Sequence, residues 1–466
     1  MSQNLSYAPT AGNPFTQGPL GPIFAKTALP IIFVMSMNGL LTVVDAMFLG
    51  RYVGAQALGA VTLIFPMFML IVALSTLVSN GMSSILARHL GAGEGDAARA
   101  VFAGAHGLAL AVGALLIMFY LLFGANLAYF LAAGALPLAQ MAQTYLAITT
   151  CMAPLLFVLS VNSDALRNEG HVGVMAALSL LVSLLNIAFN YVLIAKLEMG
   201  VAGSAYGTAL AQLVTLIIVI GFRLSGKTLL TPKALWTHSL RRGWPRILAL
   251  GAPQSLSFIG LALGSMAILL ALQLANTAQY SATVSAYGII TRVMTFAFLP
   301  LLGLTNAMQT IVGNNYGASA FARSDHSLRI GIWIGFFYCL TCQIGFSVFA
   351  APIARLFVTD PEVITAFRAI LRLTTLMFWL AGPLLLVASY FQAIGDAGRA
   401  AVLGLSKPYA FSLPLTFALP LVFGETGIWL AGPVAEILMA GLTVAVLVHR
   451  ARTHNLRYGI FQARPA

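Results

Sequence analysis

Long apolar segments recur along the whole chain and are separated by short polar or glycine-rich breaks. A helix needs about 20 mostly apolar residues to cross the hydrocarbon core of a bilayer, where it satisfies its own backbone hydrogen bonds. Of the 466 residues, 60% are hydrophobic and 8% are charged, which excludes a soluble globular chain. We therefore predict an all-α integral membrane protein. Its twelve predicted spans centre on residues 25–50, 57–87, 98–123, 140–165, 172–195, 201–223, 247–273, 282–313, 328–350, 366–392, 400–423 and 428–449.

The positions of the basic residues predict how the chain is oriented in the membrane. Most of the 24 Lys and Arg residues fall in alternate loops, on the side that also holds both termini. Loops rich in Lys and Arg stay in the cytoplasm. We therefore expect cytoplasmic N and C termini and a multi-pass protein of the bacterial inner membrane. This distribution accounts for the net charge of +12 without a nucleic-acid partner.

A basic loop from Arg223 to Arg246 separates two sets of six predicted spans. "MSSILARHLGAG" from Met82 aligns with "MQTIVGNNYGAS" from Met308 at an offset of 226 residues, which indicates two pseudo-symmetric six-helix bundles. The predicted units are a disordered cytoplasmic tail at 1–22, an N-terminal lobe at 23–224, a basic linker at 225–246, a C-terminal lobe at 247–450 and a basic tail at 451–466.

Asp45 lies within the first span, which has no other charge between Thr27 and Arg51. A charge at the centre of a bilayer costs at least about 2.5 kcal/mol, so such a residue is a candidate for function. Counting along the helix places Asp45 roughly 25 Å across the membrane, in the half away from the termini.

Three further polar residues reach the same level as Asp45 by the same count. Asn186 and Asn190 lie roughly 21 and 27 Å across on one face of the fifth span, and Thr208 of the sixth span lies roughly 10 Å below the far surface. These oxygen atoms suit a hard cation, and burial favours the protonated form of a carboxyl group. The set predicts a site that binds a hard cation or a proton. The alternative is that the amides and the hydroxyl only join helices by hydrogen bonds.

Lys407 and Glu436 are opposite charges within the eleventh and twelfth spans. Counting along the helices places them roughly 13 and 16 Å from the membrane surface on which both termini are predicted to lie. They form either a structural ion pair or a second element that responds to protons. Soft or charged side chains that are candidates for a substrate cavity are Met35, Met37, Phe65, Met67 and Arg292.

The chain resembles the multidrug and toxic compound extrusion (MATE) transporters, in particular the DinF-like branch, from about Thr27 to His449. The matching segments are "VVDAMFLG", "LARHLGAGEGDAARA", "LRNEG", "NIAFNYVLI", "YGIITR" and "VGNNYGA". The resemblance implies two six-helix lobes around a central cavity and export of amphipathic, often cationic compounds by antiport with H⁺ or Na⁺.

In that family a first-span Asp, two polar residues of the fifth span and a sixth-span Thr form the cation site, which corresponds to Asp45, Asn186, Asn190 and Thr208. Some members carry a second carboxylate where this chain has Asn190, so we rank proton coupling first and sodium second. The seventh and tenth spans lack the acidic residues of the NorM-like branch. We expect a monomer that acts on small molecules, with no cofactor and no metal beyond possible Na⁺ at these four residues.

Two other functions fit parts of the pattern. A lipid-linked precursor flippase of the same superfamily would share the duplicated spans, but it would need more cations to bind pyrophosphate than Arg292 and Lys407 supply. A membrane enzyme would need clustered carboxylates or histidines. Asp45 and Glu436 lie in different halves of the chain, which argues against an enzyme.

Overall fold

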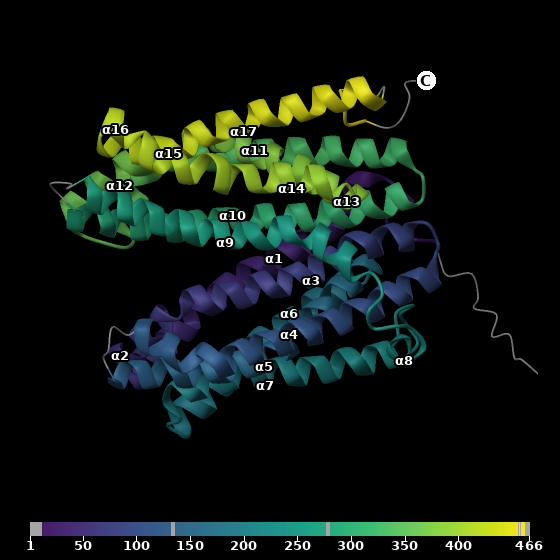
Figure 1. Ribbon diagram of the computed structural model, residues 1–466, viewed down its shortest axis with the longest axis horizontal. Helices are drawn as coiled ribbons and strands as arrows, with labels where there is room; N and C mark the ends of the chain where they lie inside the picture. Colours follow the sequence, from purple (N-terminus) through teal and green to yellow (C-terminus); the bar gives the residue numbers. More distant parts are fainter. Residues whose placement is uncertain (1–11, 132–135, 276–279, 455, 457, 462–466) are drawn as a thin grey trace, which may run out of the picture.

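The computed structural model describes residues 12–131, 136–275, 280–454, 456 and 458–461. Over these residues the secondary-structure elements are all helical, and Figure 1 shows them as two bundles that lie side by side along their lengths. The fold is the predicted all-α membrane architecture of two six-helix bundles.

The N-terminal lobe contains six spans and three short additional elements, η1, α2 and η2. Its helices are α1 (Leu20–Phe48), η1 (Leu49–Val53), α2 (Ala55–Leu63), α3 (Phe65–Gly91), α4 (Gly95–Leu131), α5 (Leu136–Asn168), α6 (Val172–Asn190), η2 (Tyr191–Lys196) and α7 (Gly200–Leu224). The helix α4 continues beyond the predicted end at residue 123, because apolar residues extend to Leu131.

The C-terminal lobe follows α8 (Ala234–Thr237) of the linker. Its helices are α9 (Trp244–Leu274), α10 (Tyr280–Gly317), α11 (Phe321–Arg355), α12 (Pro361–Thr374), α13 (Phe378–Ile394), α14 (Ala397–Leu405), η3 (Ser406–Ser412), α15 (Leu413–Ala418), α16 (Pro420–Phe423) and α17 (Glu425–His454). The helix α11 begins seven residues before its predicted start at residue 328. The polar segment that begins at Phe321 forms its first two turns outside the apolar stretch used for the prediction.

Three of the twelve predicted spans are interrupted: the second is divided at Ile64 between α2 and α3, and the other two lie in the C-terminal lobe. Ten of the described helices are long and apolar enough to cross a bilayer, and α12 with α13 form a further span bent by 47°. The predicted span at 400–423 runs through α14, η3, α15 and α16. Pro408 lies within η3 and Pro414 is the second residue of α15, and neither has a backbone N–H to donate.

The two lobes meet through a reciprocal contact that reflects the sequence repeat. A Cβ atom at Gly91 would lie 2.0 Å from the carbonyl oxygen of Asn314, and one at Gly317 would lie 2.0 Å from that of Arg88. Gly91 and Gly317, like Arg88 and Asn314, are separated by the repeat offset of 226 residues. The glycines let α3 and α10 cross in direct backbone contact on the side of the molecule where the described chain begins and ends, here called the terminus side.

The segment before α1 is ordered where the structure describes it. The Nδ2 atom of Asn13 donates to Oδ1 of Asn314 over 2.7 Å, and the Phe15 carbonyl accepts from Nδ2 of Asn315 over 3.0 Å. The side chain of Phe15 is buried. The predicted disordered tail is therefore wrong for residues 12–22, because this segment covers the seam between the lobes; residues 1–11 lie outside the described residues.

Candidate functional site

Asp45, Asn186, Asn190 and Thr208 form one hydrogen-bonded chain across three helices. Nδ2 of Asn190 donates to Oδ1 of Asp45 over 2.7 Å and to Oδ1 of Asn186 over 3.0 Å. Nδ2 of Asn186 in turn donates to the hydroxyl of Thr208 over 2.8 Å. The site therefore joins α1, α6 and α7 in the half of the N-terminal lobe away from the terminus side.

Local structure explains how the two amides of α6 reach both neighbouring helices, α1 and α7. Asn186 and Asn190 are four residues apart and so lie on the same helical face, and both are buried. The π-helical segment η2 begins directly after Asn190. A Cβ atom at position 207 would lie 2.2 Å from Oδ1 of Asn190, so Gly207 provides the space that this amide occupies.

The electrostatics of the site leave Asp45 without a cationic partner. No Lys, Arg or His lies within salt-bridge distance of its carboxylate in the part of the chain that the structure describes. Asp45 is half-buried, and the carbonyl oxygen of the Asn190 side chain is buried with no hydrogen-bond partner. Carboxylate, amide and hydroxyl oxygens are the ligands that hard cations prefer, and a carboxylate can also take up a proton.

Tyr145 is a neighbour of this site that the sequence analysis did not identify. Its side chain, on α5, lies close enough to Asp45 for the phenol and the carboxylate to interact electrostatically. Its position in an ordinary apolar span gave no signal in the sequence, because the direction of a side chain around a helix depends on how the helices pack.

Lys407 and Glu436 are in direct contact through Nζ and Oε1. The two ends of the pair differ in environment: 34% of the Lys407 side chain is exposed, against 8% for Glu436. Oε2 of Glu436 is buried without a hydrogen-bond partner. Lys407 lies in the π-helical segment η3, whose Pro408 packs against Gly260 of α9.

The five candidate cavity residues are distributed over several surfaces. Met35 packs against the core that includes residues of α1 and α10, whereas Met67 lines an apolar hollow formed by α3, α4 and α5. Phe65 is exposed beside Phe68. Met37 is half-buried, and Arg292 is exposed on α10. The contacts of the described residues do not join these five into one pocket.

A buried polar network between the lobes was also missed by the sequence analysis. Nε2 of Gln392 on α13 donates to Oδ1 of Asn80 on α3 over 2.5 Å and to the Leu250 carbonyl over 2.6 Å. Nε2 of Gln309 on α10 donates to the same Asn80 oxygen over 3.0 Å. The two bonds to Asn80 join α3 of the N-terminal lobe to α10 and α13 of the C-terminal lobe, and the bond to Leu250 lies within the C-terminal lobe.

Comparison with known families gives a match over most of the chain. The family model MatE matches residues 30–192 and 253–418, which include Asp45, Asn186, Asn190 and Lys407. The two matched segments lie in the two lobes.

The chain is also similar to named proteins and to a solved structure. It is 23% identical over 420 residues to "Probable multidrug resistance protein YoeA" of Bacillus subtilis (strain 168), covering 87% of this chain and 89% of that protein. It is 24% identical over 445 residues to the "FAD transporter" of Shewanella oneidensis, covering 93% of this chain and 95% of that protein. Its fold matches a structure described as an outward-facing multidrug resistance MATE family transporter with a TM-score of 0.84 and 23% identity, over 94% and 97% of the two chains.

Proposed function

The chain belongs to the MatE family of membrane transporters, and from this premise we propose that it exports amphipathic, often cationic compounds by antiport with protons. As a member of this family it is a transporter rather than an enzyme. The observation that supports antiport most strongly is the Asp45 carboxylate, which lies within α1 and has no cationic partner among the described residues.

The chemistry of this site explains why a carboxylate lies within the membrane. An exchanger needs a group whose charge is neutralised by the inward ion and restored when that ion leaves. Asn190 donates a hydrogen bond to Asp45, and the free Asn190 oxygen supplies an acceptor for a proton donor or a cation. With one carboxylate, a single H⁺ or Na⁺ brings the site to neutrality. Protons are our first choice and sodium is the alternative.

The orientation and organisation that we propose follow from the charge pattern. The terminus side, with its excess of Lys and Arg, faces the cytoplasm of a bacterium, and the Asp45 site lies in the half that faces the outside. In this arrangement the lobes at 23–224 and 247–450, joined by the linker at 225–246, transport the substrate as a monomer through the space between them. The contacts between α3 and α10 then close the cytoplasmic end.

The similarity to the FAD transporter favours a second candidate, export of an anionic cofactor. Arg292 is exposed on α10 and is the cation that this candidate would use for a phosphate group. The two candidates predict opposite charge preferences for the substrate.

Expression in a bacterium that lacks its own multidrug pumps tests the proposed function. We expect the chain to raise the minimal inhibitory concentrations of cationic amphiphiles several-fold and to lower ethidium accumulation. Unchanged resistance together with increased FAD in the medium would reject drug export and support the second candidate. Membrane abundance of the protein, measured by immunoblot, is the control for the resistance, ethidium and FAD measurements.

A further inference from the structure

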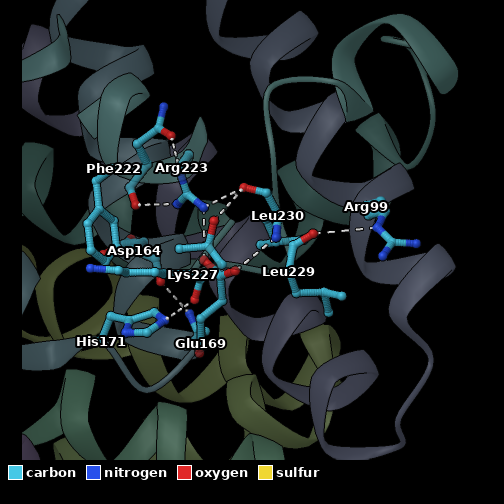
Figure 2. Close-up of polar contacts among 12 residues, drawn as sticks. Arg99, Asp164, Glu169, His171, Phe222, Arg223, Lys227, Leu229 and Leu230 are labelled. Atoms are coloured by element: carbon cyan, nitrogen blue, oxygen red, sulfur yellow. Dashed lines mark hydrogen bonds and ion pairs between the residues drawn. The ribbon is translucent and has the colours of Figure 1, made fainter. Parts of the chain in front are cut away.

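The linker between the lobes is fixed to the N-terminal lobe by a buried ion pair. Nη1 of Arg223 donates to Oε2 of Glu169 over 2.9 Å and to the Leu230 carbonyl over 2.7 Å (Figure 2). The Leu230 amide donates to the other Glu169 oxygen over 2.9 Å. The side chains of Arg223 and Glu169 are both buried. The linker therefore has a defined position at the terminus side of this lobe.

The second part of the linker lies directly on α4. A Cβ atom at Gly107 would lie 2.1 Å from the Leu240 carbonyl oxygen, and one at Gly104 would lie 2.0 Å from that of Arg242. The indole Nε1 of Trp244 donates to the Gly104 carbonyl over 2.9 Å and to the Leu240 carbonyl over 2.7 Å. These contacts fix the level of residues 240–242 along the α4 axis.

That level is where the membrane boundary is expected. Beyond Gly107, α4 exposes large apolar side chains, first Leu110 at 51% and then Leu115 at 59%. Leu110 is three residues beyond Gly107, or about 5 Å along the helix. The headgroup region on each side of a bilayer is about 5–8 Å thick. Residues 240–242 therefore lie beside the headgroups of that leaflet.

The linker presents unpaired positive charge at this level. The side chains of Arg241 and Arg242 are exposed, and the structure shows no side-chain hydrogen bond or ion pair to them within the described ranges. The nearby carboxylate of Asp96 is bonded to His238 of the linker. Leu240 is exposed next to these cations, so the surface combines positive charge with an apolar contact.

We propose that Arg241 and Arg242 form a binding site for the phosphate headgroup of an anionic phospholipid, with an acyl chain along Leu240 and Leu110. Guanidinium groups bind phosphate in a bidentate manner, and exposed leucines are suited to acyl chains. A soluble polyanion would use the cations but not the leucines. The combination of the two at one membrane level identifies a lipid.

Native mass spectrometry of the full-length protein in detergent tests the site, with dioleoyl phosphatidylglycerol as the probe. Each basic residue at an anionic lipid surface contributes about fivefold to affinity, so Arg241→Gln/Arg242→Gln is expected to bind about 25-fold more weakly. The matched control is Arg355→Gln/Arg368→Gln, which removes two exposed arginines predicted for the opposite side and should bind as the wild type. Arg241→Lys/Arg242→Lys keeps the charge and should lose only a few-fold.

Dioleoyl phosphatidylcholine and inorganic phosphate distinguish the sources of the phosphate group. We expect weak binding of the first and no competition by the second at equal concentration. Equal binding of phosphatidylglycerol by the wild type and the Arg241→Gln/Arg242→Gln variant would overturn the proposal. So would an equal loss in the control variant, or competition by inorganic phosphate as effective as that by the lipid.

Discussion

Asp45→Asn is expected to insert and fold like the wild type but to reduce export of a cationic dye to the level of cells without the transporter. Asparagine has nearly the same shape as aspartate and can still accept the hydrogen bond from Asn190. It cannot take up a proton or neutralise a cation, so no ion movement remains to drive the substrate. Dye efflux from energised cells, normalised to membrane abundance, measures the effect.

The matched control for this variant is Asp96→Asn. Asp96 is a largely exposed carboxylate in the first turn of α4, and its ion-pair contact within the described residues is with His238. We expect this variant to retain export. If Asp45→Asn exports as well as Asp96→Asn at equal abundance, Asp45 does not couple ion flow to export.

The second large effect concerns the contact between Lys407 and Glu436. Removing one partner from a buried ion pair costs about 3–5 kcal/mol, because an uncompensated charge remains. Glu436 is much the more buried of the two. Lys407→Met therefore leaves the Glu436 carboxylate without a counter-charge and largely out of contact with water. Glu436→Gln leaves an ammonium that is one-third exposed and can be hydrated. We therefore expect Lys407→Met to lower the thermal unfolding temperature and membrane abundance more than Glu436→Gln.

The double variant separates the two roles that the pair could have. Lys407→Met/Glu436→Gln leaves no unpaired charge, so abundance should recover. Recovery of export as well would assign the pair a structural role, whereas abundance without export would assign it a role in transport. Additive losses in the three variants would contradict the ion-pair contact itself.

The sequence predicted the parts of the site that depend on distance along a helix. Asp45, Asn186, Asn190 and Thr208 lie on helices that run next to one another, so the rise per residue was enough to place them at one level. In the structure, hydrogen bonds join these four side chains. The position of Lys407 opposite Glu436 on successive antiparallel spans followed from the same count.

Features that depend on rotation around helix axes, or on packing between the lobes, were not predicted. Asn80, Gln309 and Gln392 are ordinary polar residues in their spans, and their convergence depends on how α3, α10 and α13 face one another. The glycine- and proline-rich composition before α1 indicated disorder. It did not reveal that Phe15 is buried and that its carbonyl accepts a hydrogen bond from Asn315 of the C-terminal lobe.

The most direct test of coupling through Asp45 uses purified protein in proteoliposomes with an imposed pH gradient and no sodium. The wild type should move a cationic dye against its concentration gradient as protons flow in the opposite direction. Asp45→Asn should move none, and collapse of the gradient by a protonophore should stop wild-type transport. Dye movement by the wild type only after sodium is added, or equal movement by Asp45→Asn, would contradict proton coupling at this residue.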